Sequence, residues 1–194
     1  MKSKNLILFH KPYGVLCQFS GSTPNLGNFI PTKGFYAAGR LDKDSEGLLA
    51  LTNSGLLQAR ITEPRHKMSK SYWVEVEGEC SAEALNALRS GLRLKDGITR
   101  PLRADVIEAP LPERDPPVRV RKTQPTSWLN ITLKEGKNRQ IRRMTAHIGH
   151  PTLRLFRHQI GPWNIDQLKP GAWSEHAVNL PQQSSRRRRP KQLL

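Results

Sequence analysis

Apolar residues in this sequence gather in short runs that are separated by polar turns rich in glycine and proline. The runs at 6–9 and 48–51 are continuously apolar, which predicts strands, the second of them buried. Residues 72–77 alternate, with Tyr72, Val74 and Val76 on one face and charged or aromatic residues on the other. Further strands are predicted at 102–109, 128–133 and 153–160.

Helical patterns are few. One short helix is predicted around 56–61, a second runs from an N-cap at Ser81 to a stop at Gly91, and a third covers about 139–148 with Asn138 as its cap. Residues 20–34 and 65–71 are predicted loops, and the prolines between 110 and 117 indicate a lobe boundary or an exposed hairpin tip. Many strands with only three helices predict an α+β fold with a mostly antiparallel sheet, since a doubly wound parallel sheet needs more crossover helices.

The length and the net charge of the chain limit the functions that it can have. The chain has 194 residues, enough for one substantial core, which we expect over residues 1–181 as two lobes. Thirty-two lysines and arginines against 16 acidic residues leave a net charge of +16, which favours a polyanion such as RNA or DNA over a membrane as the partner. The tail 182–194 contains four consecutive arginines and is expected to be disordered.

Targeting and redox signals are weak. The apolar run at 6–9 is too short for a signal peptide or a membrane span. Cys17 and Cys80 have no cysteine or histidine neighbours at zinc-site spacing, so we interpret both as free thiols in a reducing compartment. These patterns predict a cytoplasmic protein. With no sequence signal for a dimer, we expect a monomer.

Residues 39–52 carry the strongest candidate chemistry. A charged turn between Gly39 and Gly47 contains Asp42 and leads directly into the apolar run at 48–51. A loop anchored on a buried strand holds a carboxylate in a fixed place, as an enzyme requires. The spacing alone is equally typical of a polar surface turn whose Asp or Ser caps a helix.

A second candidate segment is 135–144, where a strand ends at a Gly-Lys-Asn turn and a helix begins with three arginines. Cations near a helix N-terminus cost some tenths of a kcal/mol each, but they suit phosphate binding. For Arg139 and Arg143 a solvated basic face remains the alternative. Arg142 lies beside the apolar stripe of the helix, where a planar guanidinium is placed to pair with a buried carboxylate.

The third candidate is Tyr72, which follows Lys70 and Ser71 at the start of a predicted strand. It is either a core aromatic or a platform on which a base or sugar stacks.

These segments, in this order, resemble the motifs of the RsuA/RluB/RluE/RluF branch of the pseudouridine synthases. The resemblance spans roughly residues 4–180 and rests on four stretches: 39–47, 70–72, 135–144 and 149–162. The chain opens with the segment 8–14 that begins the catalytic domain of the family. We therefore expect it to lack the small N-terminal S4-type domain, as RluE-type enzymes of large-subunit ribosomal RNA do.

The resemblance implies an enzyme that isomerises a uridine of ribosomal RNA, free or in an assembly intermediate, to pseudouridine without a cofactor or metal. It implies that Asp42 is the nucleophile, that Arg142 pairs with it, and that Tyr72 packs on the target ring. Flipping the target out of its helix costs a few kcal/mol. The residues expected to contact RNA are Arg40, Lys70, Lys137, Asn138, Arg139, Gln140, Arg143 and Arg157.

Two other hypotheses use the same residues. A non-catalytic RNA-binding ribosome-assembly factor would need only the basic surface. A metal-dependent nuclease would hold Mg²⁺ with Asp42 and Asp44, although no further acidic residue stands in a supporting context.

Overall fold

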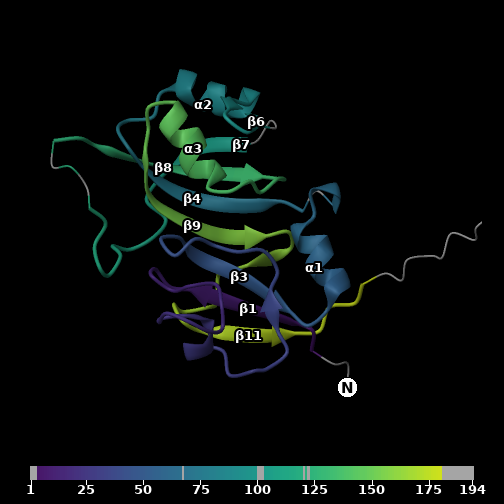
Figure 1. Ribbon diagram of the computed structural model, residues 1–194. Helices are drawn as coiled ribbons and strands as arrows, with labels where there is room; N and C mark the ends of the chain where they lie inside the picture. Colours follow the sequence, from purple (N-terminus) through teal and green to yellow (C-terminus); the bar gives the residue numbers. More distant parts are fainter. Residues whose placement is uncertain (1–3, 67, 100–102, 120, 122, 181–194) are drawn as a thin grey trace, which may run out of the picture.

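The computed structural model describes residues 4–66, 68–99, 103–119, 121 and 123–180 (Figure 1). Within these ranges, nine strands form one mixed sheet with the main order β11-β1-β3-β9-β4-β8-β7, while β2 pairs with β3 and β10 with β9. Its strands are β1 Leu6–Lys11, β2 Tyr36–Ala37, β3 Glu46–Thr52, β4 Lys70–Glu77, β7 Arg103–Ile107, β8 Thr126–Leu133, β9 Thr152–Ile160, β10 Trp163–Asn164 and β11 Trp173–His176. The predicted tail 182–194 lies outside the described residues.

A separate hairpin consists of β5, Arg93–Leu94, and β6, Gly97–Ile98. The helices among the described residues are α1 Gly55–Thr62, α2 Ala82–Ser90 and α3 Gln140–His147, with two short 3₁₀ turns, η1 Leu26–Asn28 and η2 Pro64–His66. The predicted α+β fold with a mostly antiparallel sheet is confirmed, because among the pairings between the strands named above only that of β3 with β9 is parallel.

The strands β1 and β3 are buried along their whole length, which explains the continuous apolar runs 6–9 and 48–51 within them. The polar residues at their ends, His10, Lys11, Glu46 and Thr52, are buried as well. Leu8 and Leu48 belong to the cluster that includes residues of α1, whereas Ile7 and Leu49 face the opposite cluster, which is covered by the 26–35 segment. Burial of both faces leaves no position for the polar residues that would make such a strand alternate. A continuous run was therefore the correct signal for this half of the sheet.

The other half of the sheet, β9-β4-β8-β7, has a single large core on one face. Val74 and Val76 of β4 pack there with Leu129 and Ile131 of β8, under α2 and α3 (Figure 1). The alternating pattern of β4 matches this one-sided core. The N-cap at Ser81 is confirmed, since its Oγ accepts a hydrogen bond from the Ala84 N–H at 3.2 Å, and Gly91 ends the helix with φ of +88°.

The two halves meet where β3 and β9 run parallel for two residue pairs, Glu46 with Phe156 and Gly47 with Arg157. Beside this seam, the guanidinium of Arg154 donates two hydrogen bonds, each 3.0 Å long, to the buried carboxylate of Glu46. Such a bidentate pair fixes the two strands relative to each other.

The proline-rich connection joins β7 and β8, which are neighbouring antiparallel strands, and its residues 112, 113 and 115–117 are exposed, as in the predicted hairpin tip. Its Leu111 packs against the core cluster of the β1–β3 half, and the Pro112 carbonyl accepts a hydrogen bond of 2.7 Å from Arg154 of β9. The start of this connection is therefore anchored on both halves of the sheet.

Candidate active site

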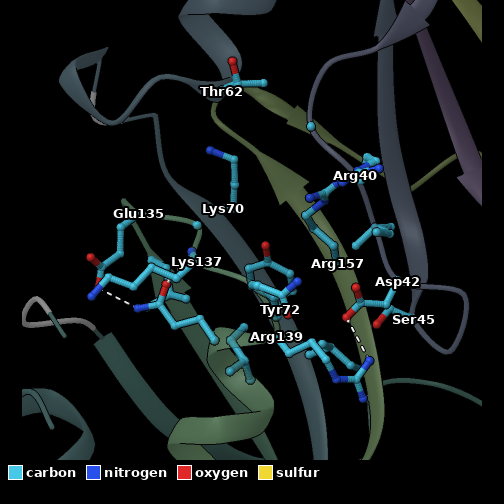
Figure 2. A pocket seen from close by; sticks show the side chains of 18 residues that line it. Arg40, Asp42, Ser45, Thr62, Lys70, Tyr72, Glu135, Lys137, Arg139 and Arg157 are labelled. Carbon is cyan, nitrogen blue, oxygen red and sulfur yellow. Dashed lines mark hydrogen bonds and ion pairs between the residues drawn. The ribbon is translucent and has the colours of Figure 1, made fainter. Parts of the chain in front are cut away.

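A cavity of about 380 Å³ lies beside the seam and is lined from both halves of the sheet. In Figure 2, Tyr72 lies between Lys137 and Glu135 on one side and Asp42, Ser45 and Arg157 on the other. Nine of the eleven predicted site residues line this cavity: Arg40, Asp42, Lys70, Tyr72, Lys137, Asn138, Arg139, Gln140 and Arg157. Arg142 and Arg143 do not line it.

Lys11 anchors the turn that packs against the Asp42 turn. This side chain is completely buried, and its ammonium donates hydrogen bonds to the carbonyls of Pro12 (2.9 Å) and Val15 (2.8 Å). The Gly14 N–H donates to the Lys43 carbonyl at 2.9 Å, which joins the 12–15 turn to the turn of Asp42. Burial lowers the pKa of Lys11 to about 8, against the opposing effect of nearby carboxylates.

One arginine bridges the two aspartates of this turn. Arg139 donates to Asp42 Oδ2 at 3.3 Å (Figure 2). It also makes a fork onto Asp44, with distances of 3.2 and 3.0 Å. Burial acts to raise the pKa of Asp44, but the hydrogen bonds and positive charges of Arg139 and Arg142 outweigh it and leave the pKa below its ordinary value. The arrangement keeps Asp44 ionised and places a cation beside Asp42.

Arg142 does not make the contact that the family resemblance implied. Its Nη2 donates to the Asp44 carbonyl at 2.8 Å and lies 3.4 Å from the Asp44 carboxylate, so its partner is Asp44 and not Asp42. The side chain projects from the first turn of α3 behind the turn that carries both aspartates, and only 13% of it is exposed. Arg142 thus supports the backbone of the Asp42 turn, and burial lowers the pKa of its guanidinium.

The start of α3 also differs from the prediction. The N-cap is Arg139, not Asn138, and it has a left-handed φ of +46° and no side-chain capping bond. Gln140, the first residue of the helix, fixes the preceding turn, because its Oε1 accepts from the Lys137 N–H at 3.0 Å while its Nε2 donates to buried Glu135 at 2.6 Å. The helix therefore begins without a side-chain N-cap, which the N-cap pattern of the sequence did not predict.

Two of the cations that were expected to bind RNA contact the β5–β6 hairpin. Arg143 forms a bidentate ion pair with Asp96 at 2.6 and 2.9 Å, and Lys137 Nζ lies 3.4 Å from the Asp96 and Ile98 carbonyls. The Arg143 side chain thus secures the hairpin to α3, while its contact with RNA stays a prediction. The signal for this role was Asp96 in a Lys-Asp-Gly turn.

Tyr72 is both a partly buried core residue and part of the cavity wall. It lies in β4, paired with Ile131 of β8, and part of its ring packs against the core cluster below α2 and α3. The remainder lines the cavity, where Ile141 lies as well. A ring fixed by a core is a rigid surface for stacking.

Two further cations lie deep in the cavity wall. Only 3% of Arg157 is exposed, and its Nε donates to the Leu48 carbonyl at 2.8 Å. Lys70 Nζ donates to the Ile61 carbonyl at 2.9 Å, at the end of α1, and to the Met68 carbonyl at 3.3 Å. Burial, with a smaller contribution from the charge of Arg157, lowers the pKa of Lys70 to about 8.

The described part of the chain has neither a cluster of metal ligands nor a helix suited to a bilayer. No group of three or more His, Cys, Asp or Glu side chains there is placed to hold a metal ion. Among the described helices, none is both long and apolar enough to cross a bilayer. Asp42 and Asp44, the pair that a nuclease would use, are both bonded to Arg139.

Taken together, a carboxylate, an aromatic ring and several cations around one cavity are typical of a site that acts on a nucleotide in a nucleic acid. A sequence profile described as RNA pseudouridylate synthase matches residues 5–147. The chain belongs to this family and is an isomerase.

Individual relatives place it within the RluE-type branch, as the sequence motifs predicted. It is 52% identical over 184 residues to the ribosomal large subunit pseudouridine synthase E of Vibrio vulnificus (strain CMCP6), covering 93% of this chain and 78% of that protein. It is 54% identical over 190 residues to the protein of the same name from Xanthomonas axonopodis pv. citri (strain 306), covering 94% and 100%. A solved structure titled "Crystal structure of pseudouridylate synthase" superposes with a TM-score of 0.76 at 25% identity, covering 91% of this chain and 71% of that one.

Proposed function

We propose that this protein converts a uridine of large-subunit ribosomal RNA into pseudouridine, with Asp42 as the reactive carboxylate. The observation that carries the proposal is that Asp42 and Tyr72, which come from opposite halves of the sheet, line one cationic cavity. Relatives that are more than half identical over most of this chain are named for this reaction on the large ribosomal subunit. A cavity of about 380 Å³ is within the range of sites that hold one small ligand.

The reaction breaks the bond between N1 and C1′ of the uridine and forms a bond between C5 and C1′. The proton on C5 leaves, and N1 gains a proton, so the change is an isomerisation. Three routes are open to the Asp42 carboxylate: attack on C1′, attack on C6 of the base, or removal of the 2′ proton. Each requires an ionised carboxylate in a poorly hydrated place.

The arginines act on this turn in different ways. Arg139 places its guanidinium 3.3 Å from Asp42 Oδ2. Arg142 holds the Asp44 carbonyl and so fixes the turn; it is a positioning residue in this proposal. Tyr72 offers its ring to the flipped-out base.

The remaining cations of the cavity suit the RNA backbone. Arg40, Lys70 and Arg157 line the side of the cavity next to α1 and β9, where phosphates that flank the target nucleotide would lie. The partner is therefore ribosomal RNA, free or within an assembling particle. We propose that the protein acts as a monomer in the cytoplasm.

The test uses Asp42→Asn with Asp166→Asn as the matched control, since Asp166 is exposed and does not line the cavity. An unmodified transcript of large-subunit ribosomal RNA is incubated with each protein, and its pseudouridines are mapped. Wild type and Asp166→Asn should form pseudouridine at one position. Asp42→Asn should bind the RNA with similar affinity and form none.

A different outcome would point elsewhere. RNA binding by the wild type with no modified base would favour the ribosome-assembly factor. Pseudouridine formation by Asp42→Asn would show that the reaction does not require the Asp42 carboxylate.

A further inference from the structure

A second cavity of about 380 Å³ adjoins the candidate active site. It is lined by Tyr13, Gly14, Asp42, Lys43, Asp44 and Arg139. Asp42 and Arg139 line both cavities, so the two are next to each other at this ion pair. Anything bound in the second cavity lies within reach of the nucleotide in the first.

Tyr13 is the aromatic residue of this second cavity, and 36% of it is exposed. The guanidinium carbon of Arg114 lies 3.7 Å from the centroid of its ring. Arg114 is not among the lining residues, so it supports the ring from outside the cavity. A ring that is backed by a cation on one side and open on another has a π-face available for a ligand.

The guanidinium of Arg114 is itself held firmly. It donates to the Pro116 carbonyl at 2.8 Å and to the Pro117 carbonyl at 3.4 Å, and it lies 4.0 Å from the Glu46 carboxylate. Its side chain is only 10% exposed. The proline-rich connection therefore crosses the seam and holds the guanidinium of Arg114 against the ring of Tyr13.

The turn of Tyr13 is fixed relative to Asp42. The bond between the Gly14 N–H and the Lys43 carbonyl joins it to the Asp42 turn, and buried Lys11 anchors its carbonyls. The ring thus has a set position beside the reactive carboxylate. Lys43 adds an exposed cation on the rim of the same cavity.

We propose that Tyr13, backed by Arg114, is a stacking platform for an unpaired RNA base next to the target uridine. A single-stranded base is the ligand that this chemistry fits: an aromatic face for the ring, and Lys43 for a phosphate. A purely structural tyrosine would need neither the second cavity nor its open face. The inference rests on the proposed function, since it concerns a neighbour of the target nucleotide.

The experiment is a double-mutant cycle between protein and RNA. A short synthetic RNA is centred on the mapped uridine, and an abasic nucleotide is placed at each flanking position in turn. The proteins are wild type, Tyr13→Ala, Tyr13→Phe and Tyr36→Ala. Tyr36 is the matched control, because it is 38% exposed and lines neither cavity.

Tyr13→Ala should raise KM roughly 10-fold or more, with a smaller change in kcat. An abasic nucleotide at one flanking position should raise the KM of the wild type similarly, and the two changes together should add little more. Tyr13→Phe keeps the ring and should restore most of the affinity. Tyr36→Ala should match wild type.

Additive effects at every flanking position would overturn the proposal, as would a KM for Tyr13→Ala equal to that of Tyr36→Ala. Thermal denaturation shows whether Tyr13→Ala folds. If it does not, the abasic RNAs are tested with the wild type and Tyr13→Phe alone. If none of the abasic positions weakens their binding, no neighbouring base is stacked and the proposal is overturned. If the wild type forms no pseudouridine, the proposed function fails separately. Filter binding of an unstructured single-stranded RNA to wild type, Tyr13→Ala and Tyr36→Ala then tests the platform without turnover, and equal affinities would overturn it.

Discussion

Replacement of Gly47 by alanine tests whether the seam between β3 and β9 determines the site. Gly47 has φ of +102°, and a Cβ there would lie 2.3 Å from the Arg157 carbonyl oxygen, where ordinary contact begins at 3.4 Å. The neighbour is backbone, so no change of rotamer relieves the overlap. Left-handed backbone costs an alanine about 1–2 kcal/mol, and forcing apart packed groups costs about 1–3 kcal/mol. We expect a loss of about 2–5 kcal/mol.

The matched control is Gly34→Ala, since Gly34 has φ of +83° but nothing within 4 Å of an added Cβ. It should lose only the conformational part, about 1–2 kcal/mol. For a chain of this size, thermal denaturation should show a Tm lower by about 4–20 °C for Gly47→Ala and by about 2–8 °C for Gly34→Ala. Because Arg157 lines the cavity, kcat/KM should fall for Gly47→Ala alone. Equal Tm values for the two variants would refute the idea that a Cβ at position 47 overlaps the backbone of β9.

Three further predictions concern the site. Tyr72→Phe should keep most activity and Tyr72→Ala should lose far more; equal losses in a pseudouridine assay would contradict the stacking role. The pKa of Lys11 is about 8 when folded and about 10.4 when unfolded, so the unfolded state binds more protons between these values. Urea denaturation should therefore show wild type gaining stability over Lys11→Met from pH 8 to 10, by at most about 1.4 kcal/mol per pH unit; a flat difference would refute this. Release of the C5 proton should continue in excess EDTA, and its loss would favour metal-dependent chemistry.

The longer elements of the fold could be predicted because their signals are local. The buried run of β3, the alternation of β4 and the Ser81 cap each describe one segment and its solvent exposure. The strands β2, β5, β6 and β10 have two residues each, too few for any period to show. The strand β11 forms by pairing with β1, in a register that joins Leu6 to His176. Such a pairing depends on the rest of the sheet and has no local pattern.

Membership of the site could also be predicted, but the pairing within it could not. Motif positions brought Asp42, Tyr72 and Arg139 to one cavity, as expected. The partner of Arg142 depends on how far α3 is rotated against the Asp42 turn, which a sequence pattern leaves open. Asp44 was considered only as a metal ligand, although two arginines contact it.

Arg139 shows how a local cost in a sequence can indicate a distant partner. A non-glycine residue at φ of +46° is strained by about 1–2 kcal/mol, and a cation at the start of a helix adds a smaller penalty. Neither is relieved inside α3, because Arg139 has no side-chain capping bond. The compensation comes from Asp42 and Asp44, which lie 97 and 95 residues away in the sequence. The conformation of this first helical turn and the charge beside Asp42 are therefore set by one interaction, so a substitution at Asp44 should disturb both together.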